Sequence, residues 1–144
     1  MAVAVNSQHD KLETHLARLA QRVEALGLEC LQPHEQVALV AYTAHGIVSR
    51  EGMRQFYAGK TPLSGLVSAL RALNLKPLAN AAEATASQFP DPALADDPGA
   101  RREHLAHLDT AKQDYVFFRL SSEELLDAIA AYWKRHAKLG GSPS

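Results

Sequence analysis

Apolar residues recur at spacings of three and four along most of the chain, which is the pattern of helices with one buried face. The first stretch predicts a helix over about residues 8–26, with Ser7 or Asp10 as its cap and Gly27 at its end. Its buried stripe is expected to hold Leu12, Leu16, Leu19, Val23 and Leu26.

Prolines indicate where the next helices begin. Pro33 suits the first turn of a second helix. Gly46 weakens this helix near its end, and Ser49 can then cap a short third segment. Pro62 and Pro77 open two more helices, and the latter is rich in alanine and reaches the next proline. The inward faces are expected to hold Val37, Val40, Ala41, Ala44, Val48, Leu63, Leu66, Val67, Leu70 and Leu73.

The C-terminal third begins with residues 90–99, where three prolines and a glycine predict a loop. Ser121 and Glu124 then form a capping box for a last helix, which Gly140 and the following glycine end. No stretch alternates apolar and polar residues as a strand does. We therefore expect an all-α fold, a single compact bundle of about six or seven helices over residues 1–144. Apolar positions of the last two helices are Leu105, Leu108, Ala111, Tyr115, Leu125, Leu126, Ile129, Ala130 and Trp133.

Composition agrees with one packed domain, because 47% of the 144 residues are hydrophobic and 22% are charged. A formal net charge of −1 does not favour general binding to nucleic acid or to an acidic membrane surface. The first residues lack the basic segment of a secretion signal, and the single Cys30 cannot form an internal disulfide. We therefore expect a cytoplasmic protein.

Few residues suggest catalysis or metal binding. His104 and His107 stand three apart, but no second pair of ligands repeats on a facing helix. Glu13 with His15, or Glu51 with His45, could exchange a proton, yet no third residue is placed to orient them. Phosphate loops, nucleophile elbows and Cys-x-x-Cys motifs are absent from the sequence. We expect no enzyme activity, no metal and no cofactor.

The charges are distributed unevenly along the chain. Residues 83–127 carry ten acidic and four basic residues, which is a sum of −6. Such a region is expected to attract a basic protein, with a solvated helix surface as the alternative interpretation. The candidate partner-binding residues are Asp91, Asp96, Asp97, Glu103, Asp109, Asp114, Glu123 and Glu124, followed by Asp127.

The segment 49–57 gathers two arginines, an amide and two aromatics around a glycine. One interpretation is a turn and a short helix whose Met53, Phe56 and Tyr57 enter the core. The alternative is a site for a small molecule or nucleic acid. It would be formed by Arg50, Arg54, Gln55, Tyr57 and Lys60.

This segment, the alanine-rich helix ending in Phe-Pro and the final Tyr-Trp-Lys-Arg-His together resemble the DMP19-like (DUF4375) family over about residues 33–137. The family signature Asn-Asn-Gly-Gly-Phe-x-Gln-Phe-Phe falls on residues 49–57, where Gly52, Gln55 and Phe56 match and Ser49, Arg50 and Glu51 differ.

The resemblance implies an all-α fold without known catalysis. For the family's namesake it implies a dimer whose acidic surface imitates the DNA phosphate backbone and occupies a DNA-binding regulator. We therefore expect a protein-binding module that presents its acidic region to a basic protein, which is a DNA-binding regulator or a toxin that it neutralises as an immunity protein. The resemblance also makes a homodimer one assembly to expect.

Overall fold

A computed structural model describes residues 7–61 and 63–140, and within these residues the fold is all-α, as predicted, with no strand. Eight α-helices occur there, of which α3 and α6 are shorter than two turns. The helices are α1 (Ser7–Leu26), α2 (Pro33–Glu51), α3 (Met53–Tyr57), α4 (Leu63–Ala72), α5 (Lys76–Ala86), α6 (Pro98–Arg101), α7 (Ala111–Arg119) and α8 (Ser122–Gly140). Short 3-10 helices cover Leu28–Cys30, Pro92–Asp96 and Arg102–His107.

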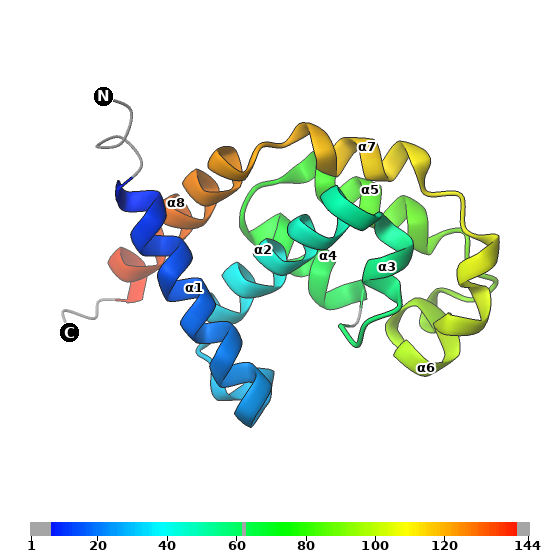
Figure 1. Cartoon of the computed structure of the whole chain (residues 1–144), viewed down its shortest axis with the longest axis horizontal. Helices are drawn as coiled ribbons and strands as arrows, with labels where there is room; N and C mark the ends of the chain where they lie inside the picture. The colour runs from blue at the N-terminus through cyan, green and yellow to red at the C-terminus, as the bar shows by residue number, and fades with distance from the viewer. Residues whose placement is uncertain (1–6, 62, 141–144) are drawn as a thin grey trace.

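Helix α2 is the centre of the arrangement, because α1, α3, α4, α7 and α8 all contact it. Helices α1 and α8 lie together at one end of the molecule, while α3 and α6 lie at the other (Figure 1). The buried side chains form one cluster, in which Tyr57, Met53 and Phe117 are completely buried. Alanines on α5, such as Ala79 and Ala82, allow α4 to approach closely.

Most of the predicted helix signals are confirmed. Pro33 stands in the first turn of α2, and the capping box of Ser121 and Glu124 forms, with each side chain accepting a hydrogen bond from the other residue's N–H at 3.0–3.1 Å. Four of the five leucine and valine positions predicted for α4 are buried. Pro62 and Gly141 lie outside the described residues.

Several predicted boundaries are wrong. Helix α2 continues through Gly46 to Glu51, so Ser49 lies inside it, and Gly52, with a φ of 93°, separates α2 from α3. Helix α1 begins at Ser7, so Asp10 lies within its first turn. Tertiary packing also alters the predicted faces, because Leu26, Ala111, Tyr115 and Ala130 are exposed, while Val37 and Val40 are only half-buried.

The region around residues 90–110 differs most from the prediction. Instead of a simple loop, residues 92–96 form a 3-10 helix and α6 begins at Pro98. The predicted helix over 105–115 is interrupted, because residues 108–110 are not helical. Leu108 is extended there, and its carbonyl accepts hydrogen bonds from the guanidinium of Arg54. A long-range contact therefore replaces a helical turn.

Candidate functional site

Four of the predicted partner-binding residues lie together in residues 91–103, which we call the acidic lobe. The lobe contains α6 and lies at the opposite end of the molecule from α1 and α8 (Figure 1). Asp91, Asp96, Asp97 and Glu103 are all exposed. All four carboxylates are therefore accessible to solvent.

Backbone N–H groups hold three of these carboxylates in place. Asp91 and Asp97 each accept a hydrogen bond at 3.0 Å from the N–H two residues further along the chain. Asp96 reaches the start of α4, where it accepts from the N–H of Ser64 at 2.8 Å. Aspartate is favoured at helix starts because its oxygen satisfies an N–H that has no partner within the helix. The three negative charges are thus fixed rather than mobile.

The two arginines of the acidic lobe do not pair with its carboxylates. Arg101 is completely buried, and its guanidinium donates to the carbonyls of Tyr57 and Ala95 at 2.8 Å and of Gly59 at 3.1 Å. Burial lowers the pKa of Arg101, and Tyr57, Asp96 and Asp97 oppose that shift. Arg102 donates to another carbonyl at 3.3 Å. The acidic lobe therefore presents carboxylates without cationic partners among the described residues.

The other acidic candidates are placed differently. Asp114 is half-buried and accepts from the N–H of Met53 at 2.7 Å and from the hydroxyl of Thr110 at 3.0 Å, so it caps α3. Glu123 and Glu124 lie at the start of α8, away from the acidic lobe (Figure 1). Asp127 accepts a hydrogen bond from His9 on α1 at 2.7 Å. Asp109 is exposed and follows the 3-10 helix Arg102–His107. The eight candidates therefore fall into separate groups.

The segment 49–57 agrees mainly with its structural interpretation. Met53, Phe56 and Tyr57 are buried, and burial raises the pKa of the Tyr57 hydroxyl. The guanidinium of Arg54 donates a hydrogen bond to the carbonyl of Leu108, while Gln55 and Lys60 are exposed. The proposed cluster of Arg50, Arg54, Gln55, Tyr57 and Lys60 is therefore not assembled as one site.

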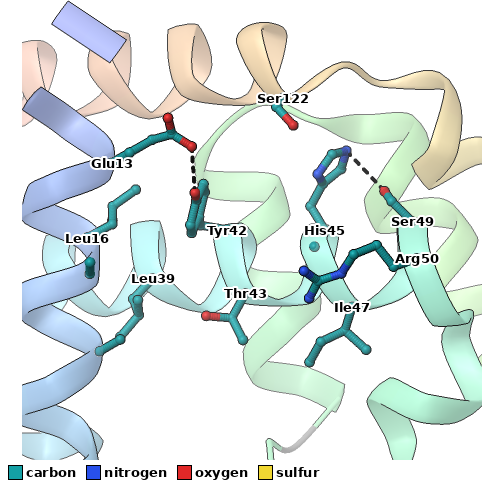
Figure 2. A pocket seen from close by; sticks show the side chains of 13 residues that line it. Glu13, Leu16, Leu39, Tyr42, Thr43, His45, Ile47, Ser49, Arg50 and Ser122 are labelled. Atoms are coloured by element: carbon teal, nitrogen blue, oxygen red, sulfur yellow. Dashed lines mark hydrogen bonds between the residues drawn. The ribbon is translucent and has the colours of Figure 1, made fainter. Parts of the chain in front are cut away.

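Helices α1 and α2 and the start of α8 enclose a cleft of about 410 Å³, which the sequence did not indicate. Figure 2 shows Glu13 and Tyr42 at one end and His45, Ser49 and Arg50 at the other. The Tyr42 hydroxyl donates to a Glu13 oxygen at 2.7 Å. Burial, together with this bond and the Glu13 charge, raises the pKa of Tyr42 to about 12, although Arg50 opposes the shift.

His45 and Ser49 resemble a nucleophile and its base but are not arranged as one. The Nε2 atom of buried His45 lies 2.7 Å from the carbonyl oxygen of Leu120 and 3.5 Å from the Ser49 hydroxyl (Figure 2). A carbonyl can only accept, so Nε2 must carry the proton and has no lone pair to offer to Ser49. The pairs of Glu13 with His15 and Glu51 with His45 also gain no hydrogen bond among the described residues.

A second hollow, of about 380 Å³, lies where α7 meets the junction of α2 and α3. Tyr115 and Phe118 on its rim are 60% and 67% exposed, which is unusual for aromatic side chains. Ser49 and Arg50 line both this hollow and the cleft. The exposed aromatics are a surface feature that the sequence prediction, which placed Tyr115 on an inward face, did not identify.

The predicted histidine pair lies on the 3-10 helix Arg102–His107, where His104 packs against the ring of Phe89 with centroids 6.0 Å apart. Among the described residues, no three His, Cys, Asp or Glu side chains are grouped so that they could hold a metal ion.

None of the helices in the described part of the chain has the length and apolar character needed to cross a membrane.

No family model, no curated protein and no solved structure matches the chain.

Proposed function

We propose that this protein is a non-catalytic binding module that presents its acidic lobe to a basic protein. The observation that carries the proposal is that the positively and negatively charged side chains within residues 91–103 make different contacts. Both arginines donate to backbone carbonyls, whereas the four carboxylates are exposed and have no cationic partner among the described residues. Because the lobe has four carboxylates and two guanidinium groups, of which that of Arg101 is buried, it presents an excess of negative charge to solvent.

The fixed positions of these carboxylates support a specific contact. Asp91, Asp96 and Asp97 are already held by N–H groups, so their side chains lose little conformational freedom when a lysine or arginine approaches. Charges of this kind raise association rates and are screened over roughly 8 Å at physiological ionic strength. The resemblance to the DMP19-like family favours a DNA-binding regulator or a toxin as the basic partner.

The test removes charge without removing the helix caps. In the lobe variant, Asp91, Asp96 and Asp97 become Asn and Glu103 becomes Gln. Asparagine caps helices about as well as aspartate, so the fold should be retained. A control variant loses the same number of charges elsewhere, at exposed side chains on other elements. It combines Asp10→Asn, Glu24→Gln, Glu29→Gln and Glu51→Gln.

Each purified protein is used to capture partners from a lysate of the source cells at about 50 mM and 500 mM salt. We expect the wild type and the control variant to retain the same basic protein at low salt. The lobe variant should not retain it, and high salt should release it from the wild type and the control variant. Equal retention by the lobe variant, or binding that is indifferent to salt, would contradict the proposal.

A further inference from the structure

We propose that the cleft between α1 and α2 is a binding site for a small amphipathic monoanion, that is, a single carboxylate or similar group on an apolar body. Helix α1, which forms one wall of the cleft, lies at the other end of the molecule from the acidic lobe (Figure 1), and the cleft and the lobe share no residue, so this site is separate from the proposed protein contact. Its volume of about 410 Å³ is in the range of small-molecule sites.

The cationic end of the cleft is the guanidinium of Arg50. Its side chain folds back along α2 toward Tyr42 and Thr43 (Figure 2). The guanidinium passes over Gly46, where an Arg50 nitrogen lies 3.8 Å from the position that a Cβ of residue 46 would take, an ordinary van der Waals distance. Arg50 forms no ion pair among the described residues, whose ion pairs are His9–Asp127 and Arg71–Glu83. The guanidinium is therefore available for a bidentate contact with a carboxylate.

Hydroxyl groups surround the same end of the cleft. Ser49 and Ser122 both line it, and Figure 2 shows them on either side of the His45 ring. The bond from His45 to the Leu120 carbonyl fixes this ring, so the two serines flank a rigid wall. Serine hydroxyls can donate to the oxygens of an anion held by Arg50.

The rest of the cleft is largely apolar. Leu16 and Leu39 lie beneath it and are almost completely buried, so the apolar surface that a ligand can cover belongs mainly to Ala17, Ala20 and Ile47. The short side chains of the two alanines line the α1 side of the cleft and are exposed there. An apolar ligand body would cover this surface and gain roughly 25 cal/mol for each Å² removed from water.

Glu13 limits the ligand to one negative charge. Its carboxylate lies at the opposite end from Arg50 and already accepts from Tyr42 (Figure 2). A second anionic group at that end would meet a like charge, which is unfavourable in a partly enclosed site. A dianion of the same length should therefore bind more weakly than a monoanion.

The experiment titrates the ¹⁵N-labelled full chain with octanoate, octanedioate or octylammonium and follows amide shifts. We expect octanoate to shift amides that line the cleft, with the other two probes at least tenfold weaker. Arg50→Gln should weaken octanoate at least tenfold, which is about 1.4 kcal/mol, whereas Arg50→Lys should retain part of the affinity. Arg18→Gln, an exposed arginine elsewhere on α1, serves as the control and should bind octanoate as the wild type does.

A second variant tests the space itself. Ala17→Leu should fill the α1 side and abolish the octanoate shifts, while Ala25→Leu, exposed on the same helix and outside the cleft, should leave them unchanged. Far-UV circular dichroism confirms that each variant is folded. Equal binding of octylammonium and octanoate, unchanged affinity in Arg50→Gln, or shifts that persist in Ala17→Leu would overturn the assignment.

Discussion

Replacing Arg101 with methionine should cost more stability than any other substitution of an arginine in the described residues. Its side chain is 0% exposed and donates three hydrogen bonds, to the carbonyls of Tyr57, Ala95 and Gly59. These carbonyls belong to the last residue of α3, to the segment after α3 and to the 3-10 helix before α6. One guanidinium therefore ties two irregular segments together.

The expected loss follows from the carbonyls that remain. A buried polar group without a partner costs about 1–3 kcal/mol, and water can reach the carbonyl of exposed Gly59 more easily than the other two. The guanidinium also stacks over the Tyr57 ring, with its carbon 5.1 Å from the centroid. Relief of the desolvation cost of a buried cation offsets part of this loss. We expect Arg101→Met to lower the free energy of unfolding by about 3–5 kcal/mol.

Urea unfolding followed by circular dichroism measures this difference. With a slope of about 2 kcal/mol per M, the midpoint should fall by roughly 2 M. Arg101→Lys should lie between, because an ammonium lacks the planar fork that reaches three carbonyls. Arg102→Met is the matched control, since Arg102 is exposed and makes one bond at 3.3 Å, and it should change stability by less than about 0.5 kcal/mol. A midpoint shift below about 0.5 M in Arg101→Met would refute this reasoning.

Three further predictions concern the cleft and the cap of α3. Asp114→Ala should destabilise the fold by about 1–3 kcal/mol in the same urea assay, because the N–H of Met53 loses its acceptor. Asp114→Asn should lower the free energy of unfolding by less, because its amide oxygen can still accept this hydrogen bond. Gly52→Ala should lower the unfolding midpoint, because φ is 93° and the new Cβ would lie 3.1 Å from an Asp114 oxygen; an unchanged midpoint would contradict it. The pKa of Tyr42, raised to about 12 from 10.0, predicts that the stability linked to this group is present below pH 10 and is lost as pH rises from 10 to 12. Ultraviolet titration of Glu13→Gln should show Tyr42 ionising at lower pH than in the wild type.

The long helices could be predicted from the sequence because their signals are local. Pro33, the capping box of Ser121 with Glu124 and the leucine pattern of α4 each depend on residues within one or two turns. The region 90–110 could not be predicted in this way. There Leu108 is extended so that its carbonyl can meet Arg54, 54 residues away, and propensity does not report such a contact.

The cleft was missed for a related reason. Glu13 and Tyr42 are 29 residues apart, and only the crossing of α1 over α2 brings them together. Ala17 and Ala20 look like ordinary helix formers in the sequence, yet in the fold they leave space beside α2. Arg101 gave no signal either, because arginine is expected on the surface and its burial is due to carbonyls supplied by distant segments.

The acidic excess of residues 83–127 has a structural cause besides the function that we propose for it. Five of its ten carboxylates accept hydrogen bonds from backbone N–H groups, Glu83 pairs with Arg71 and Asp127 contacts His9, so helix starts and side-chain pairs account for much of the composition. Capping does not neutralise a carboxylate, however, and those of the acidic lobe remain exposed. Replacement by asparagine separates the two causes, because it keeps the cap and removes the charge. If partner binding survives that replacement, the acidic lobe exists to form its helices; if binding is lost while the fold persists, the charge itself is recognised. The five capping carboxylates belong to Asp91, Asp96, Asp97, Asp114 and Glu124.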